Sequence, residues 1–116
     1  MLLVEDNDDT RQALARLLRH RGYRVIETHD GQEAWEYLES GGRASVIVLD
    51  LMMPRLNGRL FRAKQLEHEE HASIPVIVFT ATDGELPDVA AVVRKSNPDT
   101  LLDIIDRTAS GPVLED

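Results

Sequence analysis

The sequence predicts one α/β domain in which a parallel sheet is covered by helices on both faces. Short, almost entirely apolar runs alternate along the chain with stretches whose apolar residues recur at helical spacing. Strands that are apolar throughout, rather than at every second position, are typical of a parallel sheet buried on both sides. The chain has 116 residues, 42% of them hydrophobic, which is enough for a single core.

Five apolar runs, several of them rich in β-branched residues, are the expected strands. They occupy residues 2–4, 23–28, 46–49, 74–80 and 90–94. Pro75 is compatible with a strand because it stands near the beginning of its run, where a missing backbone donor is tolerated. No repeat, low-complexity tract or linker divides the pattern, so we expect one domain.

Four helices are expected, each with one apolar face. The first helix is capped by Asp8 or Asp9 and ends before Gly22. The second covers residues 31–40, and the third runs from 58 to about 71. The fourth is capped by Asn97 and has Pro98 in its first turn. The expected buried faces carry Ala13, Leu14, Leu17 and Leu18; Ala34, Trp35 and Leu38; Leu60, Phe61 and Leu66; and Leu101, Leu102, Ile104 and Ile105.

The composition restricts the class of partner. A net charge of −8 opposes direct contact with nucleic acid and with anionic membrane surfaces. The absence of cysteine excludes disulfides and thiolate metal sites and fits a reducing compartment. No apolar run approaches the ~20 residues of a membrane span, and the first residues lack the features of a signal peptide. We therefore predict a cytoplasmic protein that binds neither membranes nor nucleic acid directly.

Polar side chains follow the expected strands at their carboxyl ends, which meet at one edge of a parallel sheet. Glu5 and Asp6 follow the first strand, and Asp50 follows the third. The fourth strand ends at Thr80, and the fifth ends at the basic pair 94–95. A carboxylate at the end of a buried strand is costly unless it has a partner there. The sequence therefore predicts a site in which three acids, a hydroxyl and an amine converge.

The residue types of this site favour a hard divalent cation and a phosphoryl group. Three close carboxylates repel one another unless a cation lies among them. Oxygen ligands of this kind suit Mg²⁺ together with water and phosphate. Asp50 would then be a nucleophile that forms an aspartyl phosphate. Lys95 would balance the remaining negative charge, and the hydroxyl of Thr80 would donate to a phosphoryl oxygen.

Four stretches resemble the receiver domain of bacterial two-component response regulators, over essentially the whole chain. They are "LLVEDN" (2–7), "VIVLDLMMPRLNG" (46–58), "VIVFTA" (76–81) and, less closely, "VVRKSNPDTLL" (92–102). The resemblance implies a flavodoxin-like five-stranded parallel sheet in the order 2-1-3-4-5. It also implies a receiver domain over residues 1–110, followed by a frayed tail over 111–116.

The resemblance implies a phosphoacceptor that is not a turnover enzyme. Asp50 would accept the phosphoryl group, with Thr80 and Lys95 assisting, and Ala81 would leave room for the group to enter. Met52 and Thr82 occupy positions that tune the lifetime of the phosphoryl group in the family.

The resemblance also implies a metal site and a set of protein partners. Mg²⁺ (or Mn²⁺) would be bound directly by Asp6, Asp50 and the backbone carbonyl of Met52, and by Glu5 through water. The phosphoryl donor would be a histidine kinase or a histidine phosphotransfer protein. An effector domain or target protein would receive the signal, and a homodimer is possible.

Three departures from the family pattern lie in the last third of the chain. The segment 82–89 is short and contains Gly84 and Pro87, so we expect the fourth helix to be missing or reduced to about a turn. The alternative is a short helix over 85–93 with loss of the fifth strand. Ser96 stands where a proline usually follows the lysine, and alignment through "PDTLL" would put Arg94 in place of Lys95. Receivers often carry an aromatic switch residue on the fifth strand, and in this chain that position is Val92.

These departures leave a second function open. The chain could be an interaction domain that no longer depends on phosphorylation. A Mg²⁺-dependent phosphohydrolase is disfavoured, because "DLMMP" lacks the second acid that aspartate-nucleophile phosphatases carry. The "EHEEH" stretch (67–71) lacks the H-E-x-x-H spacing of a zinc site, so a solvated helix end is the better interpretation.

Overall fold

The computed structural model describes residues 1–51, 57–81 and 89–109. It contains a five-stranded parallel sheet in the order β2-β1-β3-β4-β5, which confirms the predicted fold class. The strands are β1 (Leu2–Val4), β2 (Ile26–Thr28), β3 (Ile47–Leu49), β4 (Val76–Thr80) and β5 (Ala91–Arg94). The helices are α1 (Asp8–His20), α2 (Gly31–Glu39), α3 (Gly58–Leu66), α4 (Glu69–Ala72) and α5 (Pro98–Ala109).

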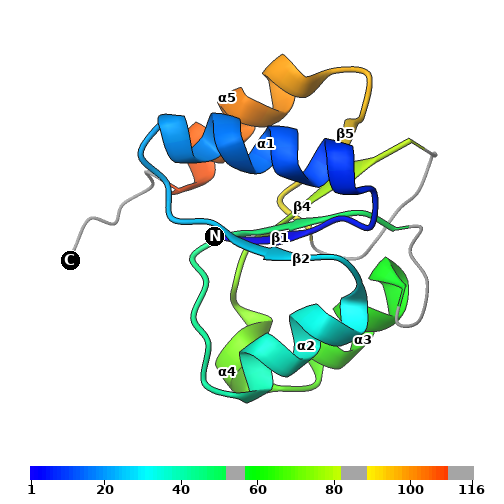
Figure 1. The fold of residues 1–116 in the computed structure, drawn as a ribbon. Coiled ribbons are helices and arrows are strands. Elements are labelled where there is room, and N and C mark those ends of the chain that lie inside the picture. The colour runs from blue at the N-terminus through cyan, green and yellow to red at the C-terminus, as the bar shows by residue number, and fades with distance from the viewer. Residues whose placement is uncertain (52–56, 82–88, 110–116) are drawn as a thin grey trace.

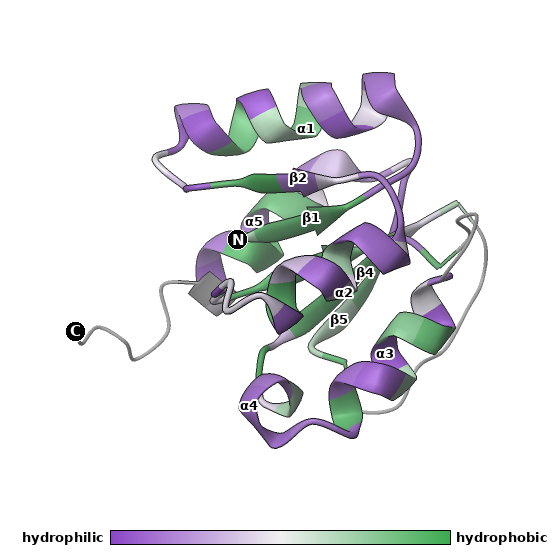
Figure 2. Cartoon of the chain, turned by 60° about the horizontal axis from the view of Figure 1, so that its bottom comes forward, coloured by the Kyte–Doolittle hydropathy of each residue, from purple (hydrophilic) through white to green (hydrophobic). Residues whose placement is uncertain are grey.

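The sheet is the middle of three layers (Figure 1). Helices α1 and α5 cover one face, and α2, α3 and α4 cover the other. Successive strand side chains point to opposite faces, so neighbouring residues such as Leu2 and Leu3 belong to different halves of the core. Figure 2 shows the strands as mostly apolar and the helices as alternating between polar and apolar residues. The continuous apolar runs of the sequence are explained by this burial on both faces.

The register brings the carboxyl ends of the strands to one edge. Val4 is paired with Leu49, so the residues that follow them, Glu5 and Asp50, leave adjacent strands at the same level. The backbone N–H of Asp50 donates to the carbonyl of Val4 at 3.1 Å, which extends the ladder by one residue. Beyond β5, the N–H of Lys95 donates to the carbonyl of Thr80 at 2.9 Å in the same way. The backbone around the candidate site is thus held by the sheet itself.

Helix α1 differs from the prediction in its cap and in its buried face. Its N-cap is Asn7, whose side chain accepts from the N–H of Thr10, rather than Asp8 or Asp9. The buried residues are Leu14, Ala15 and Leu18, whereas Ala13 and Leu17 are exposed. The prediction was right for Leu14 and Leu18, and the buried face is turned toward Ala15 and the partly buried Arg11, one turn before Leu14, instead of toward Ala13 and Leu17.

The helix expected from 58 to about 71 is divided into α3 and α4. Gln65 is fully buried, and its amide donates to the carbonyls of His71 (2.8 Å) and Ile74 (3.1 Å). These bonds turn the chain back toward β4. The buried residues of α3 are Gly58, Phe61, Arg62 and Gln65, whereas Leu60 and Leu66, expected in the core, are 53% and 40% exposed.

The two histidines of "EHEEH" are not a solvated helix end. The rings of His68 and His71 lie edge-on to the buried indole of Trp35, with centroid distances of 4.8 and 5.7 Å. Both side chains are half-buried. The expectation of a solvated end failed because Trp35 comes from α2, and sequence spacing within 67–71 contains no information about that contact.

The connection between β4 and β5 lies mostly outside the described residues, since 82–88 fall in a gap. The prediction of a missing or one-turn helix there concerns this gap, and α4 is a different element that precedes β4. The alternative with a helix over 85–93 and no fifth strand is wrong, because residues 91–94 form β5. The proposed tail over 111–116 also lies outside the described residues. Within the described ranges, none of the helices has the length and apolar character needed to cross a bilayer.

Candidate functional site

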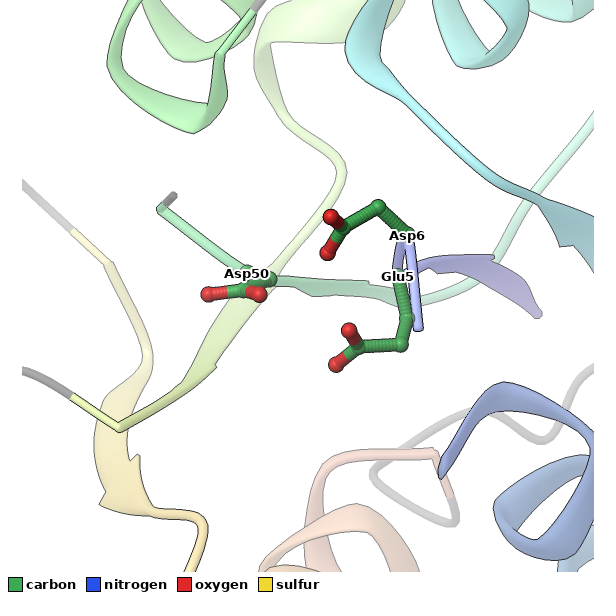
Figure 3. Close-up of side chains that lie close together, drawn as sticks. All are labelled: Glu5, Asp6 and Asp50. Atoms are coloured by element: carbon green, nitrogen blue, oxygen red, sulfur yellow. The ribbon is translucent and has the colours of Figure 1, made fainter. Parts of the chain in front are cut away.

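Three carboxylates converge at the carboxyl edge of the sheet. One oxygen from each of Glu5, Asp6 and Asp50 lies within 4.8 Å of the others. Figure 3 shows Glu5 and Asp6 leaving the end of β1 while Asp50 leaves the end of the neighbouring β3. Residues far apart in the chain are therefore brought into one acidic cluster, as the strand ends in the sequence predict.

Burial sets the character of two of these acids. Glu5 and Asp50 are 2% and 4% exposed, whereas Asp6 is open to solvent. Burial raises the pKa of Glu5 above its usual value, although hydrogen bonds from Lys95 and from the N–H of Asn7 oppose the shift. The charged form of Glu5 is therefore held at a cost, which a cation in the cluster would offset.

Lys95 provides one positive charge inside the cluster. Its ammonium group lies 2.7 Å from Oε1 of Glu5 and 3.0 Å from Oδ2 of Asp50. Burial disfavours the charged ammonium, but its contacts with these two carboxylates outweigh that penalty and raise the pKa of Lys95. Arg94, the other candidate for this position, is the last residue of β5 and is exposed. The structure therefore brings Lys95 into contact with two of the acids.

Of the other predicted site residues, Thr80 and Ala81 belong to the described part of the chain. Thr80 is fully buried at the end of β4, in register with Arg94. Ala81 follows it and is exposed. Met52 and Thr82, predicted as a metal ligand and as tuning positions, lie outside the described residues.

The donor set of the cluster fits a hard divalent cation. Among the described residues, the three carboxylates and the ammonium group of Lys95 together have more negative than positive charge when all four groups are ionised. All the side-chain donors are oxygens, which suit Mg²⁺ or Mn²⁺ rather than softer metals. Two of the acids are also fixed by burial and hydrogen bonds before any ion arrives.

Gly58 is a site residue that the sequence did not identify. A Cβ atom at this position would lie 2.3 Å from the carbonyl oxygen of Asp50 and 2.7 Å from Cα of Leu51. The N–H of Gly58 donates to the carbonyl of Leu51 at 3.2 Å. Helix α3 therefore begins directly against the backbone of Asp50, which only glycine allows. The available signal was a glycine at the expected start of the helix, soon after Asp50 in the chain.

Asn7 is a second residue that sequence analysis missed. Its N–H donates to Oε2 of Glu5 at 3.0 Å, while its side chain caps α1. It thus connects the orientation of a buried acid to the start of the helix. The choice between Asn7, Asp8 and Asp9 as the cap depends on the exact turn geometry, which spacing does not determine.

Comparison with known proteins agrees with this geometry. The family model for the response regulator receiver domain matches residues 1–107. The two-component response regulator-like protein PRR37 of Oryza sativa subsp. indica is 38% identical over 85 residues, or 72% of this chain. The response regulator MprA of Mycobacterium ulcerans is 40% identical over 92 residues, or 79% of this chain. These matches span only 12% and 38% of the two relatives.

Solved structures share the fold. The receiver domain of a signal transduction histidine kinase from Syntrophus aciditrophicus has a TM-score of 0.85 at 24% identity, covering 99% of this chain and 92% of that one. The Mn²⁺-bound response regulator Rcp1 has a TM-score of 0.82 at 22% identity, covering 99% and 97%. TrrA from Thermotoga maritima, in complex with Mg²⁺-BeF, has a TM-score of 0.80 at 25% identity, covering 92% and 96%.

The family match extends over almost the whole chain and includes Glu5, Asp6 and Asp50, the three residues of the acidic cluster. The same residues that converge in the structure are those that carried the resemblance in the sequence. The chain belongs to the response regulator receiver domain family of two-component signal transduction, whose members are phosphoacceptor modules and not turnover enzymes.

Proposed function

We propose that this chain accepts a phosphoryl group on Asp50 in a two-component phosphorelay. The observation that carries the proposal is the convergence of three carboxylates within 4.8 Å of one another, with the ammonium group of Lys95 in contact with two of them. A structural cluster of surface acids would not need two members buried and hydrogen-bonded at the end of a sheet. Receiver domains generally partner histidine kinases, so the donor we propose is a phosphohistidine of a kinase or phosphotransfer protein.

The proposed reaction is a transfer from nitrogen to oxygen. A carboxylate oxygen of Asp50 attacks phosphorus, and the new P–O bond forms as the P–N bond of the phosphohistidine breaks. The electron pair of the broken bond stays on the imidazole nitrogen of the donor, which takes up a proton. The product is an aspartyl phosphate, and later attack by water returns the carboxylate and releases phosphate.

The chain's own residues have distinct parts in this step. Lys95 contacts Asp50 before the transfer, and we propose that it then follows the negative charge onto a phosphoryl oxygen. Thr80, at the end of the adjacent strand β4, would donate its hydroxyl proton to another oxygen. Ala81 leaves space for entry, and Thr82 would tune the lifetime of the product.

The proposed cofactor is Mg²⁺ or Mn²⁺, the ions named for the TrrA and Rcp1 structures. Asp6, Asp50 and the carbonyl of Met52 would bind it directly, and Glu5 through water. A bound divalent ion supplies positive charge against the phosphoryl oxygens. The acid-rich donor set supports this choice, because one ammonium group does not neutralise three carboxylates.

The test is incubation with Mg²⁺ and acetyl phosphate, followed by intact mass measurement. We expect the wild-type chain to gain the mass of one phosphoryl group and the Asp50→Asn variant to gain none. Asp103→Asn is the matched control, because Asp103 is an exposed aspartate on α5 and its loss should leave labelling unchanged. Absence of labelling in the wild type under conditions that label an ordinary receiver would contradict the proposal.

A second candidate is a phosphorylation-independent interaction domain. It is favoured by the name of PRR37, a relative described as response regulator-like, and by the exposed Val92 at the aromatic switch position. For this function, Asp50→Ala should leave partner binding and cellular output unchanged. A large change in either would reject it in favour of the phosphoacceptor.

A further inference from the structure

Arg11 connects the acidic cluster to two other parts of the fold. It lies in the first half of α1, and its side chain is 13% exposed. Nη1 donates to the carbonyl oxygen of Glu5 at 3.2 Å, Nη2 lies 2.8 Å from Oδ1 of Asp8, and Nε lies 3.3 Å from Oε1 of Glu27. Each nitrogen of the guanidinium group therefore has its own acceptor, and the three acceptors come from the end of β1, from α1 and from β2.

Of these three contacts, the hydrogen bond to the carbonyl oxygen of Glu5 connects Arg11 to the acidic cluster. The carbonyl of Glu5 and the N–H of Asp6 belong to the same planar peptide unit. Fixing this plane fixes the backbone from which both acid side chains leave. On the other side of the turn, the N–H of Asn7 holds the carboxylate of Glu5. Arg11 and Asn7 thus constrain the Glu5–Asp6 turn from the backbone and from the side chain.

We propose that Arg11 is a positioning residue for the divalent cation, acting through the Glu5–Asp6 peptide. The inference rests on the proposed function, because it concerns the same acidic cluster. The hydrogen bonds and ion pairs of Arg11 are to the carbonyl oxygen of Glu5 and to the carboxylates of Asp8 and Glu27, so it acts on the cluster through the backbone. Partners that orient metal ligands from outside typically change metal affinity by about 10- to 100-fold when they are removed.

A positioning role and a purely electrostatic role of Arg11 predict opposite changes in cation affinity when the side chain is removed. If its only effect were electrostatic, removal of a positive charge beside a cation site would strengthen cation binding. If it holds the turn, removal would weaken cation binding in spite of the lost repulsion. Arg11→Lys separates the two effects further, because lysine keeps the charge but cannot give three acceptors a planar fork.

Arg19 provides a matched control on the same helix. It lies 2.9 Å from the other carboxylate oxygen of Glu27, and it also donates to a backbone carbonyl, that of Val25, at 2.9 Å. It therefore makes the same kinds of contact with the same acidic partner, but its carbonyl belongs to the segment before β2. Loss of Arg19 should cost stability without changing the Glu5–Asp6 turn.

The experiment titrates wild type, Arg11→Met, Arg11→Lys and Arg19→Met with Mn²⁺, and the free ion is measured by electron paramagnetic resonance. Thermal unfolding of the metal-free proteins is recorded in parallel. We expect both Arg11 variants to bind Mn²⁺ at least about tenfold more weakly than wild type, and Arg19→Met to bind as wild type does. The melting temperatures of Arg11→Met and Arg19→Met should both fall, and only the Arg11 variants should also lose Mn²⁺ affinity.

Each other outcome has a defined meaning. Unchanged or tighter binding by Arg11→Met would overturn the positioning role, and so would wild-type affinity in Arg11→Lys. Equal weakening in Arg19→Met would also overturn it, because the effect would then follow general loss of stability. Failure of the wild-type chain to bind Mn²⁺ would instead reject the metal site of the proposed function.

Discussion

At the scale of single residues, the site is a balance between buried acids and one base. Glu5 and Asp50 share the ammonium group of Lys95, and Asp6 lies in the same cluster but is open to solvent. Burial raises the pKa of Glu5 even with Lys95 beside it. The metal-free protein therefore keeps an ionised Glu5 at the expense of stability, which is a common property of functional sites.

The raised pKa of Glu5 predicts how stability depends on pH. At pH values above 4.5, the usual pKa of this side chain, the folded protein binds the proton on Glu5 more tightly than the unfolded chain does. Stability from this group therefore falls as pH rises through 4.5 toward the folded pKa. Urea unfolding in metal-free buffer should show this fall in wild type and a flatter profile in Glu5→Gln. Glu39→Gln, at an exposed helix end, should follow wild type, and a profile for Glu5→Gln as steep as wild type would contradict the assignment.

Gly58 predicts a second residue-scale effect. In Gly58→Ala the new Cβ would collide with the backbone of Asp50 and Leu51, so we expect a loss of about 1–3 kcal/mol in the free energy of unfolding. Displacement of Asp50 should also slow phosphoryl uptake from acetyl phosphate.

Gly22→Ala separates these two consequences. Gly22 has φ of 97° and open space around it, so alanine should cost about 1–2 kcal/mol through backbone strain without moving Asp50. Its rate of phosphoryl uptake should match wild type. If Gly58→Ala also labelled at the wild-type rate, close packing of α3 on Asp50 would have no part in the site.

The sequence identified the charged residues of the site better than their supports. Asp50, Glu5 and Asp6 could be assigned because each follows an apolar run whose direction in a parallel sheet is fixed. Gly58 and Arg11 were missed, because their contacts with Asp50 and Glu5 arise from the packing of helices against strand ends. A helical pattern based on apolar residues also excludes an arginine whose guanidinium group is fully paired.

At the scale of elements, the break between α3 and α4 is the main departure from the expected pattern. Apolar spacing predicted one helix to about residue 71, but the buried amide of Gln65 binds two carbonyls beyond α3. It also accepts from Nη1 of the buried Arg62 at 2.8 Å. This polar network replaces the apolar contacts that Leu60 and Leu66 would have made, and both leucines are exposed.

Gln65→Met tests the importance of this network. Methionine has a similar size but would leave buried polar groups of Arg62, His71 and Ile74 without their bond to this side chain. We expect a loss of about 2–3 kcal/mol in the free energy of unfolding by urea. Gln12→Met on α1, where the side chain is exposed, should change stability by less than about 0.5 kcal/mol. Equal stability of the two variants would show that the network does not hold α3 and α4 together.

At the scale of the whole molecule, the fold was predictable because its rules are few. Continuous apolar runs alternating with helical patterns restrict the architecture to a covered parallel sheet, and the strand order followed from the family resemblance. Strand lengths were less predictable. The second run was expected over 23–28, but only Ile26–Thr28 pair in the sheet, at an edge where β1 provides the ladder. The run predicted from residue 23 is longer than β2, because β1 pairs only with Ile26–Thr28.

The most direct test of the account is the identity of the residue that carries the phosphoryl group. After incubation with Mg²⁺ and acetyl phosphate, the aspartyl phosphate can be reduced with borohydride to homoserine and located by peptide mass spectrometry. The account predicts the reduced residue at position 50, only in samples that contained a divalent cation. Modification at any other position, or equal modification at Asp50 after complete chelation of divalent ions, would contradict it.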